Sequence, residues 1–400
     1  MIRGLRSGLL ALVLALPQAL PAQDLAELPL AELQAQADAG GTAAQIALGQ
    51  RHHDGTGVVQ NFAVAAEWYA RAAEAGNAEA QNRLGRYYHT GLGVAADPAQ
   101  ARRWLRAAAD QGAPEHLHDL AAVLEETAAD DAALAEAAAL YGQAAEAGHT
   151  RSAVSLGMLY QNGRGVAQDF ARARALYEGP AAAGDARAQN NLGLLYVRGH
   201  GVPQDYDRAA QLFAGAAEQG LRTAMTNLGV MYENGFGVPQ SDAEAARLYR
   251  LGGAGETREA ATFVYDPRLA PPPSEPQEIA ALRDAARTGD PVAAFQMGWL
   301  LVHREPPGPA DWQEAAALFA ANAEKGHPAS MANLALLYIR GTGVPQDYVL
   351  AQMWLALAGS AGLEAALPLG LGLRERMTPD QINEAQARAE ARWPGAQDTQ

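Results

Sequence analysis

The sequence predicts an all-α protein, a right-handed α-solenoid superhelix of about nine helix-turn-helix repeats of 36 residues. Three observations lead to this prediction. A Leu-Gly pair recurs with successive spacings of 36, 72, 36 and 36 residues, its glycine lying at positions 49, 85, 157, 193 and 229. A Gly-x-Gly-Val motif follows most of these pairs in the same register, and a further glycine closes each unit. Fixed periods of about 20–50 residues are typical of solenoids and related repeat folds.

Residues 1–22 have the layout of a secretory signal peptide. Arg3 and Arg6 precede an apolar run from Gly8 to Leu16, and small residues lead up to Ala22, after which we expect cleavage. The run is much shorter than the about 20 residues that a membrane-spanning helix needs. We therefore expect a periplasmic or secreted protein without stable membrane insertion.

The composition excludes several classes of function. The chain has 45 acidic and 30 basic residues, so its net charge is −15, and removal of the two arginines in the signal peptide gives −15 − 2 = −17. Such a charge repels the phosphate backbone, which excludes nucleic acid as the main partner. The absence of cysteine excludes disulfides, thiolate catalysis and cysteine-ligated metals.

Each unit reads as two amphipathic helices joined by the Gly-x-Gly-Val loop, because apolar residues recur at spacings of three and four on both sides of it. The first glycine of the loop supplies the left-handed residue that ends the first helix. A residue with a side-chain oxygen then caps the second helix, at Asn61, Asp97, Asp169, Asp205, Ser241, Asp311 and Asp347.

The predicted organisation follows from the spacing of these motifs. It comprises a signal peptide (1–22), an N-terminal half-repeat (23–41), six repeats (42–255), a degenerate repeat with a proline-rich loop (256–289), two repeats (290–362), and a capping helix with a tail (363–400). In the third repeat Ala121 replaces the packing glycine. The degenerate repeat should begin with a helix at Thr257–Tyr265, and a final helix at Pro379–Trp393 is expected to cap the open end.

The segment AQNNLGLLYVRGHGVPQDY, residues 188–206, resembles the Sel-one-like repeat family, a relative of the tetratricopeptide repeats. The segment EWYARAAEAG, residues 67–76, does so as well. The resemblance recurs in at least six units and extends over about 320 residues, from 42 to 362. It implies an α-solenoid that binds other proteins, often in signalling or envelope complexes, and has no chemistry of its own.

A 36-residue unit cannot bury its own apolar face, so the units stack and leave an extended concave surface. The groove-facing positions of the related family, carried onto this register, imply exposed sites three before, one after and four after the packing glycine. With two arginines at helix starts, the implied protein-binding residues are Arg151, Val154, Met158, Gln161, Arg187, Asn190, Leu194, Val197, Thr226, Val230 and Glu233. Apolar and amide groups in such a mixture favour a peptide or helix as ligand. Arg151 and Arg187 either bind acidic groups or are a solvated surface pair.

No motif predicts a catalytic residue, a cofactor or a metal. The Gly-x-Gly loops lack the third glycine and the preceding strand of a nucleotide-binding fingerprint. On the repeat register His53, His89 and His118 face the groove, but successive helices lie roughly 10 Å apart, which is too far for a shared ligand sphere. The motifs of serine hydrolases and zinc peptidases are absent.

The sequence therefore predicts an exported repeat scaffold that mediates protein–protein interaction in the cell envelope, without intrinsic catalysis. Its partner would be a protein or peptide, in an envelope signalling or assembly complex. Family resemblance also implies two alternatives, a periplasmic regulator that binds and restrains a sensor kinase, and a cell-wall peptide or β-lactam hydrolase. The hydrolase relatives are rich in cysteine, which this chain lacks. A purely structural envelope role stays open.

Overall fold

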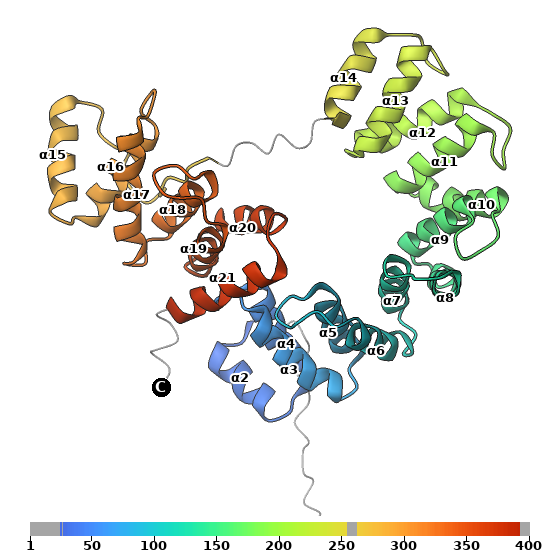
Figure 1. Cartoon of the computed structure of the whole chain (residues 1–400), viewed down its shortest axis with the longest axis horizontal. Coiled ribbons are helices and arrows are strands. Elements are labelled where there is room, and N and C mark those ends of the chain that lie inside the picture. The colour runs from blue at the N-terminus through green and yellow to red at the C-terminus, as the bar shows by residue number, and fades with distance from the viewer. Residues whose placement is uncertain (1–24, 26, 254–261, 393–400) are drawn as a thin grey trace, which may run out of the picture.

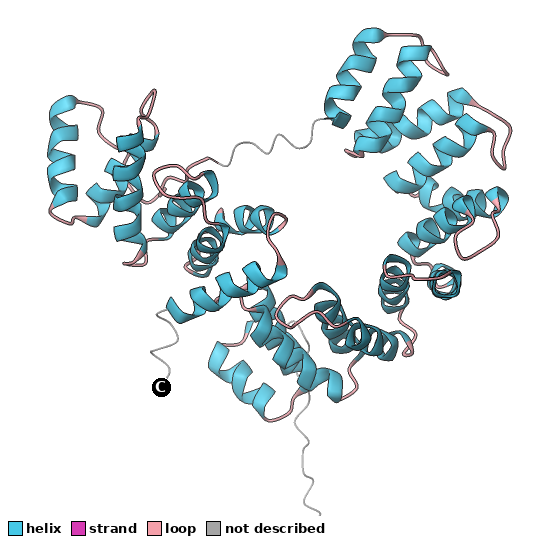
Figure 2. Ribbon diagram, in the orientation of Figure 1, coloured by secondary structure: helices cyan, strands magenta, loops and turns pink. Residues whose placement is uncertain are grey.

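The computed structural model describes residue 25 and residues 27–253 and 262–392, and in this part of the chain all regular structure is helical (Figure 2). The predicted signal peptide lies outside the described residues. The helices are α2 (Leu30–Asp38), α3 (Thr42–Asp54), α4 (Phe62–Glu74), α5 (Ala78–Thr90), α6 (Pro98–Ala109), α7 (Pro114–Glu126), α8 (Asp131–Glu146), α9 (Thr150–Asn162), α10 (Phe170–Ala182), α11 (Ala186–Arg198), α12 (Tyr206–Glu218), α13 (Arg222–Asn234), α14 (Asp242–Gly253), α15 (Pro276–Arg287), α16 (Pro291–Val302), α17 (Pro309–Ala323), α18 (Pro328–Arg340), α19 (Tyr348–Ser360), α20 (Ala366–Arg374) and α21 (Pro379–Arg392).

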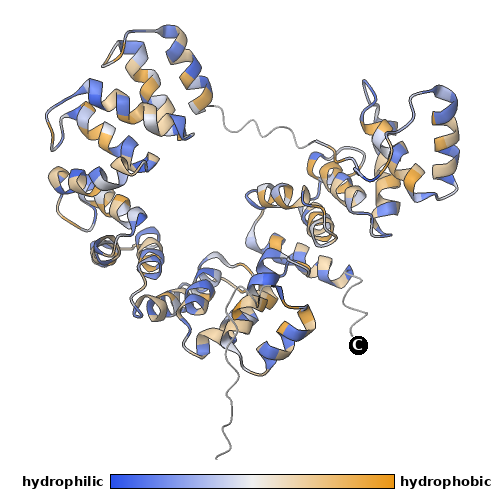
Figure 3. Cartoon of the chain, turned by 180° about the vertical axis from the view of Figure 1, so that it is seen from behind, coloured by the Kyte–Doolittle hydropathy of each residue, from blue (hydrophilic) through white to orange (hydrophobic). Residues whose placement is uncertain are grey.

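The helices form two stacks, which confirms the predicted all-α repeat architecture. Each helix from α2 to α14 packs against the next, packing between consecutive helices begins again at α15 and continues to α20, and α21 packs on α19. In Figure 1 the first stack follows an arc, and the second stack returns to lie beside the first helices of that arc. Polar and apolar residues alternate along the helices, as amphipathic packing requires (Figure 3).

The loop glycines have the conformations that the motif predicts. Gly163 ends α9 in the left-handed region with φ 65°, and Gly165 follows with φ 67°. A Cβ atom added to Gly165 would lie 2.4 Å from the carbonyl carbon of Leu134 in the preceding repeat. Glycine is thus required here both by backbone conformation and by the close approach of two repeats.

The predicted capping column is correct at six of its seven positions. Asn61, Asp97, Asp169, Asp205, Ser241 and Asp347 each accept a backbone N–H bond in the first turn of a second helix. The prediction for Asp311 was wrong, because α17 begins earlier, at Pro309, after the N-cap Gly308. Asp311 lies inside the first turn and accepts the N–H of Gly308 at 2.8 Å.

The third helix pair, α7 and α8, is built differently from the others. Its connection, residues 127–130, has four residues, whereas residues 163–169 between α9 and α10 number seven. Helix α8 has 16 residues and α10 has 13, so about one helical turn replaces the glycine loop.

The helix predicted at Thr257–Tyr265 is wrong over its described part. Residues 262–265 form no helix or other regular structure, and residues 257–261 lie outside the described residues. The amide of Asn333 in α18 accepts from Val264 N at 2.7 Å and donates to Val264 O at 2.9 Å. Both Phe263 and Tyr265, two positions apart, pack against the core of the second stack, whereas a helix would point them to different sides.

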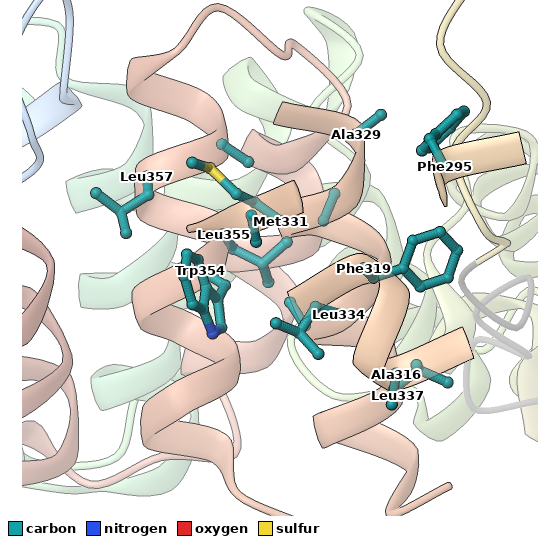
Figure 4. Packing of buried hydrophobic residues seen from close by; sticks show 14 of the residues in the cluster. Phe295, Ala316, Phe319, Ala329, Met331, Leu334, Leu337, Trp354, Leu355 and Leu357 are labelled. Atoms are coloured by element: carbon teal, nitrogen blue, oxygen red, sulfur yellow. The ribbon is translucent and has the colours of Figure 1, made fainter. Parts of the chain in front are cut away.

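The core of the second stack is the largest apolar cluster in the described part of the chain, and it contains the fully buried rings of Phe295 and Phe319. Figure 4 shows Leu334 and Trp354 packed in the same cluster, from α18 and α19. Val59, which precedes α4 in the first stack, belongs to this cluster too. The two stacks therefore share buried surface.

Helix α21 covers α19 and also contacts α4, so it joins the end of the chain to its first repeats instead of lying at an open end. Its Ile382 is 6% exposed and packs in the core of α4 and α5 with Phe62 and Tyr87. We call this contact between α19–α21 and α3–α5 the seam. Seam hydrogen bonds join Gln386 to Phe62 N (2.9 Å), Asn383 to Gly93 N (2.8 Å), and Ser360 to Val58 O (3.1 Å).

Candidate functional site

The first helices of successive pairs are aligned, so that equivalent positions lie side by side. Contacts join residues 37 positions apart: Asn82 donates to Asp119 at 2.8 Å, and Asn227 donates to Asn190 at 2.9 Å. In Figure 1, α5, α7 and α9 lie on the inner side of the arc, and α6, α8 and α10 lie on its outer side. We call the surface of these first helices the inner face.

Most residues predicted for this face are accessible. Arg151, Met158, Arg187, Thr226, Val230 and Glu233 are exposed, and Gln161, Leu194 and Val197 are partly exposed.

Two predicted residues are buried, so they cannot be surface contacts. Val154 is 2% exposed and packs with Tyr177 and Leu192, and Asn190 is 7% exposed beneath α13. Both lie three positions before the packing glycine, where the next repeat covers the side chain. Thr226 has the same register but stays exposed, because the packed stack ends with its own pair, α13 and α14.

A pocket of about 470 Å³ opens between α7, α8, α9 and α11, beside the unusual third pair. We call it the inner pocket. Its lining includes His118, Glu125, Tyr141, Arg151, Arg164 and Arg187. The structure thus brings the two predicted arginines, which are 36 positions apart in sequence, to one site.

The charges of the inner pocket are only partly balanced. Arg164 forms an ion pair with Glu125 at 3.0 Å, and the Tyr141 hydroxyl donates to the same carboxylate at 3.1 Å. Burial, followed by the charge of Glu125, raises the pKa of Tyr141 and keeps its proton in place. Arg151 and Arg187 form no ion pair with any described residue. Two accessible guanidinium groups favour a carboxylate ligand, which can accept paired N–H bonds from each.

His118 is the buried polar group at the base of the inner pocket, 9% exposed, with Nδ1 2.9 Å from the Ser152 hydroxyl. Burial, reinforced by His149 and Arg151, lowers its pKa from 6.5 to about 4. The ring is therefore neutral at pH 7 and adds no positive charge to the site.

The free energy of unfolding should fall as the pH drops from 6.5 to about 4. Over this interval the unfolded chain protonates His118 while the folded protein does not, so the proton favours unfolding. Urea denaturation across this range measures the effect, and His118→Gln should reduce the number of protons taken up on unfolding by about one. An identical pH slope in this variant would contradict the assignment.

The three predicted groove histidines lie in separate surroundings. His53 contacts the Tyr87 hydroxyl, His89 pairs with Glu126 at 3.2 Å, and His118 contacts Ser152. Among the described residues no three His, Asp or Glu side chains come together as a potential metal site.

Sequence reasoning missed Glu125, Tyr141 and Arg164 as members of the site. The signal that could have indicated them is the third repeat, in which Ala121 replaces the packing glycine and the glycine loop is absent. The short connection there leaves α7 and α8 beside the inner pocket.

No helix among residues 27–253 and 262–392 is both long and apolar enough to cross a membrane.

Comparison with known proteins identifies the repeat. The Sel1 repeat matches residues 42–77, 78–112, 150–184, 186–221, 223–254 and 328–363. The chain is similar to a Sel1 repeat protein from Oxalobacter formigenes, with 32% identity, a TM-score of 0.51, and coverage of 59% of this chain and 97% of the other. It is also similar to a protective antigen of uropathogenic Escherichia coli strains that displays an SLR fold, with 27% identity, a TM-score of 0.50, and coverage of 92% and 89%. None of the curated proteins matches it.

Proposed function

This chain belongs to the Sel1 repeat family, whose members generally mediate protein–protein interaction, and we propose that it is an exported scaffold that binds a protein partner in the cell envelope. The observation that carries the proposal is the inner pocket, with Arg151 and Arg187 accessible and outside any ion pair among the described residues. The partner would present a carboxylate-bearing segment to this face. The signal-peptide layout of residues 1–22 supports export.

Surrounding side chains suit the recognition of a peptide rather than catalysis. Met158 is 36% exposed and Val230 is 41% exposed, which provides apolar contacts along the inner face on either side of α11. Sel1 repeat scaffolds are generally non-catalytic. An extended face with separate cationic and apolar contacts binds a segment several residues long, in the manner of other solenoids.

A crosslinked pull-down from envelope extract tests the proposal, with tagged residues 23–400 as bait. Reversing both charges, Arg151→Glu with Arg187→Glu, should weaken capture of the partner by about tenfold or more, because it places carboxylates against carboxylates. The matched control reverses Arg102 and Arg208, which are exposed on the second helices α6 and α12 and form no ion pair with any described residue, and it should leave capture unchanged.

Equal capture by both double variants would exclude the inner pocket as the binding site. Export is tested separately with the full-length chain, because the protein recovered from the envelope should then have the intact mass of a chain that starts at Gln23. A mass that still includes residues 1–22 would contradict cleavage at that position.

A further inference from the structure

A second pocket lies at the seam, away from the inner pocket. It has a volume of about 280 Å³ and lies between the end of α3, the start of α4, and helices α19 and α20. We call it the seam pocket. Phe62, Gln352, Leu367, Leu371 and Arg374 are the lining residues whose chemistry identifies a ligand. Pockets for small ligands span about 300–1,000 Å³, so this one suits a ligand about the size of a single residue.

Arg374 supplies a cation to the seam pocket without a matching anion. Its guanidinium lies 5.6 Å from the centre of the Phe62 ring and hydrogen-bonds to the side chain of Gln60. Asp54 also lines the pocket, but its carboxylate accepts from Gln50 at 2.6 Å and forms no ion pair with Arg374. Burial lowers the pKa of Arg374, and no acidic group offsets that effect. A partly buried cation of this kind favours an anionic ligand.

Gln352 supplies an acceptor that lacks a donor. The residue is 2% exposed, and its Oε1 has no hydrogen-bond partner among the described residues. A buried acceptor without a donor carries an uncompensated desolvation free energy. A ligand N–H that donates to Gln352 Oε1 would remove this cost and add a hydrogen bond.

The outer wall of the seam pocket is apolar. Leu367 and Leu371 are 53% and 59% exposed, unusually high for leucine in this structure, and their spacing of four places them on one side of α20. Phe62 and Leu355, both buried, continue this surface inward. An apolar side chain of similar size would cover the exposed leucines.

One chemical group combines a carboxylate, an N–H donor and an apolar side chain within the volume of one residue: the C-terminal residue of a peptide. We propose that the seam pocket binds a peptide C-terminus that ends in a leucine-like residue. Its carboxylate pairs with Arg374, its amide N–H donates to Gln352 Oε1, and its side chain packs on Leu367 and Leu371. This site is independent of the partner surface on the inner face.

The ligand chemistry is tested with small probes, measured by calorimetry on residues 23–400. N-acetyl-leucine carries all three groups, N-acetyl-leucinamide lacks the carboxylate, and 4-methylpentanoate lacks the N–H. We expect N-acetyl-leucine to bind at least about tenfold more tightly than either of the others. N-acetyl-leucinamide leaves Arg374 without an anion, and 4-methylpentanoate leaves Gln352 Oε1 without a donor. Equal binding of N-acetyl-leucinamide would overturn the role of Arg374, and equal binding of 4-methylpentanoate would overturn the role of Gln352 and with it the assignment to a peptide C-terminus.

Two variants test the location. Arg374→Met keeps an unbranched side chain over Phe62 but removes the charge, and it should abolish the preference for carboxylate over carboxamide. Gly370→Ala adds a Cβ 3.5 Å from Gln352 Nε2, an ordinary contact distance, so the protein should fold normally while the floor of the pocket narrows and N-acetyl-leucine binding weakens. The matched control is Arg376→Met, on the same segment but outside the pocket, which should bind N-acetyl-leucine like the parent.

Absence of N-acetyl-leucine binding to the parent protein, or loss of binding in Arg376→Met as large as in Arg374→Met, would overturn the proposal. Because these probes do not involve Arg151 or Arg187, failure here leaves the inner-face binding function intact. Failure of the pull-down likewise leaves this pocket intact.

Discussion

Gly157→Ala is expected to lower the free energy of unfolding by about 2 kcal/mol, although alanine is the better helix former by about 1 kcal/mol. The added Cβ would lie 2.4 Å from Cε1 of Tyr177. That ring cannot easily move, because it is fully buried and its hydroxyl donates to Gln161 at 3.2 Å. The two helices of the pair would have to separate. Chemical denaturation monitored by circular dichroism measures the change.

Two further variants separate overpacking from other causes. Gly142→Ala lies in the neighbouring helix α8, where the nearest atom to the new Cβ is 3.8 Å away, so it should raise stability by up to about 1 kcal/mol. Adding Tyr177→Leu to Gly157→Ala reproduces the natural combination of Ala335 with Leu355, both buried in α18 and α19, and should recover most of the loss. If Gly157→Ala and Gly142→Ala shifted the free energy of unfolding in the same direction, the close contact between the two helices would not explain why glycine occupies the packing position.

Sequence alone predicts the features that recur within a unit. The packing glycine, the left-handed loop glycines and the capping column are local, and six copies of the unit repeat them in register. Tyr177 against Gly157 is one instance, and Phe213 against Gly193 is another. Such features depend on residues about 20 positions apart, so their spacing in the sequence is itself the signal.

The exposure of a side chain is harder to predict from the sequence, because it depends on whether another repeat packs over it. Val154 and Thr226 have the same register, yet one is buried and the other exposed, because only the first is covered by another repeat. Helix α20 was not predicted, since Pro368, Gly370 and Gly372 discourage a helix within a nine-residue segment. The inner pocket depends on the shortened connection of the third pair, which is a departure from the repeat.

The seam was beyond sequence prediction, because its hydrogen bonds join residues 290 or more positions apart that show no periodic relation. The side chain of Asn383 donates to Gly91 O and accepts from Gly93 N, in a glycine loop that also lies close to the backbone of Phe62 in the preceding repeat. The seam uses backbone groups of the glycine loops as well as side chains. The glycine loop therefore serves as a docking point for a helix from the far end of the chain.

Opening the seam should change the shape of the molecule more than its helix content. Ile382→Asp places a carboxylate in the apolar cluster around Phe62 and should cost about 3 kcal/mol or more, most of it in the contact between the two stacks. Each stack retains its own core, so helicity should change little. Helices α6 and α17 belong to different stacks, so their separation depends on this contact.

Spin labels at two introduced cysteines measure that separation, because the natural chain has no cysteine to compete for the label. Suitable exposed sites are Arg102→Cys on α6 and Ala317→Cys on α17. The parent should give a narrow distance distribution, and Ile382→Asp a broad one that extends to longer distances. Val292→Asp, a similar change at a side chain that is 44% exposed on α16, should keep the narrow distribution. If Ile382→Asp also kept the narrow distribution, the position of the second stack beside the first would not depend on α21. The curvature of the inner face would then have to come from packing within the two stacks.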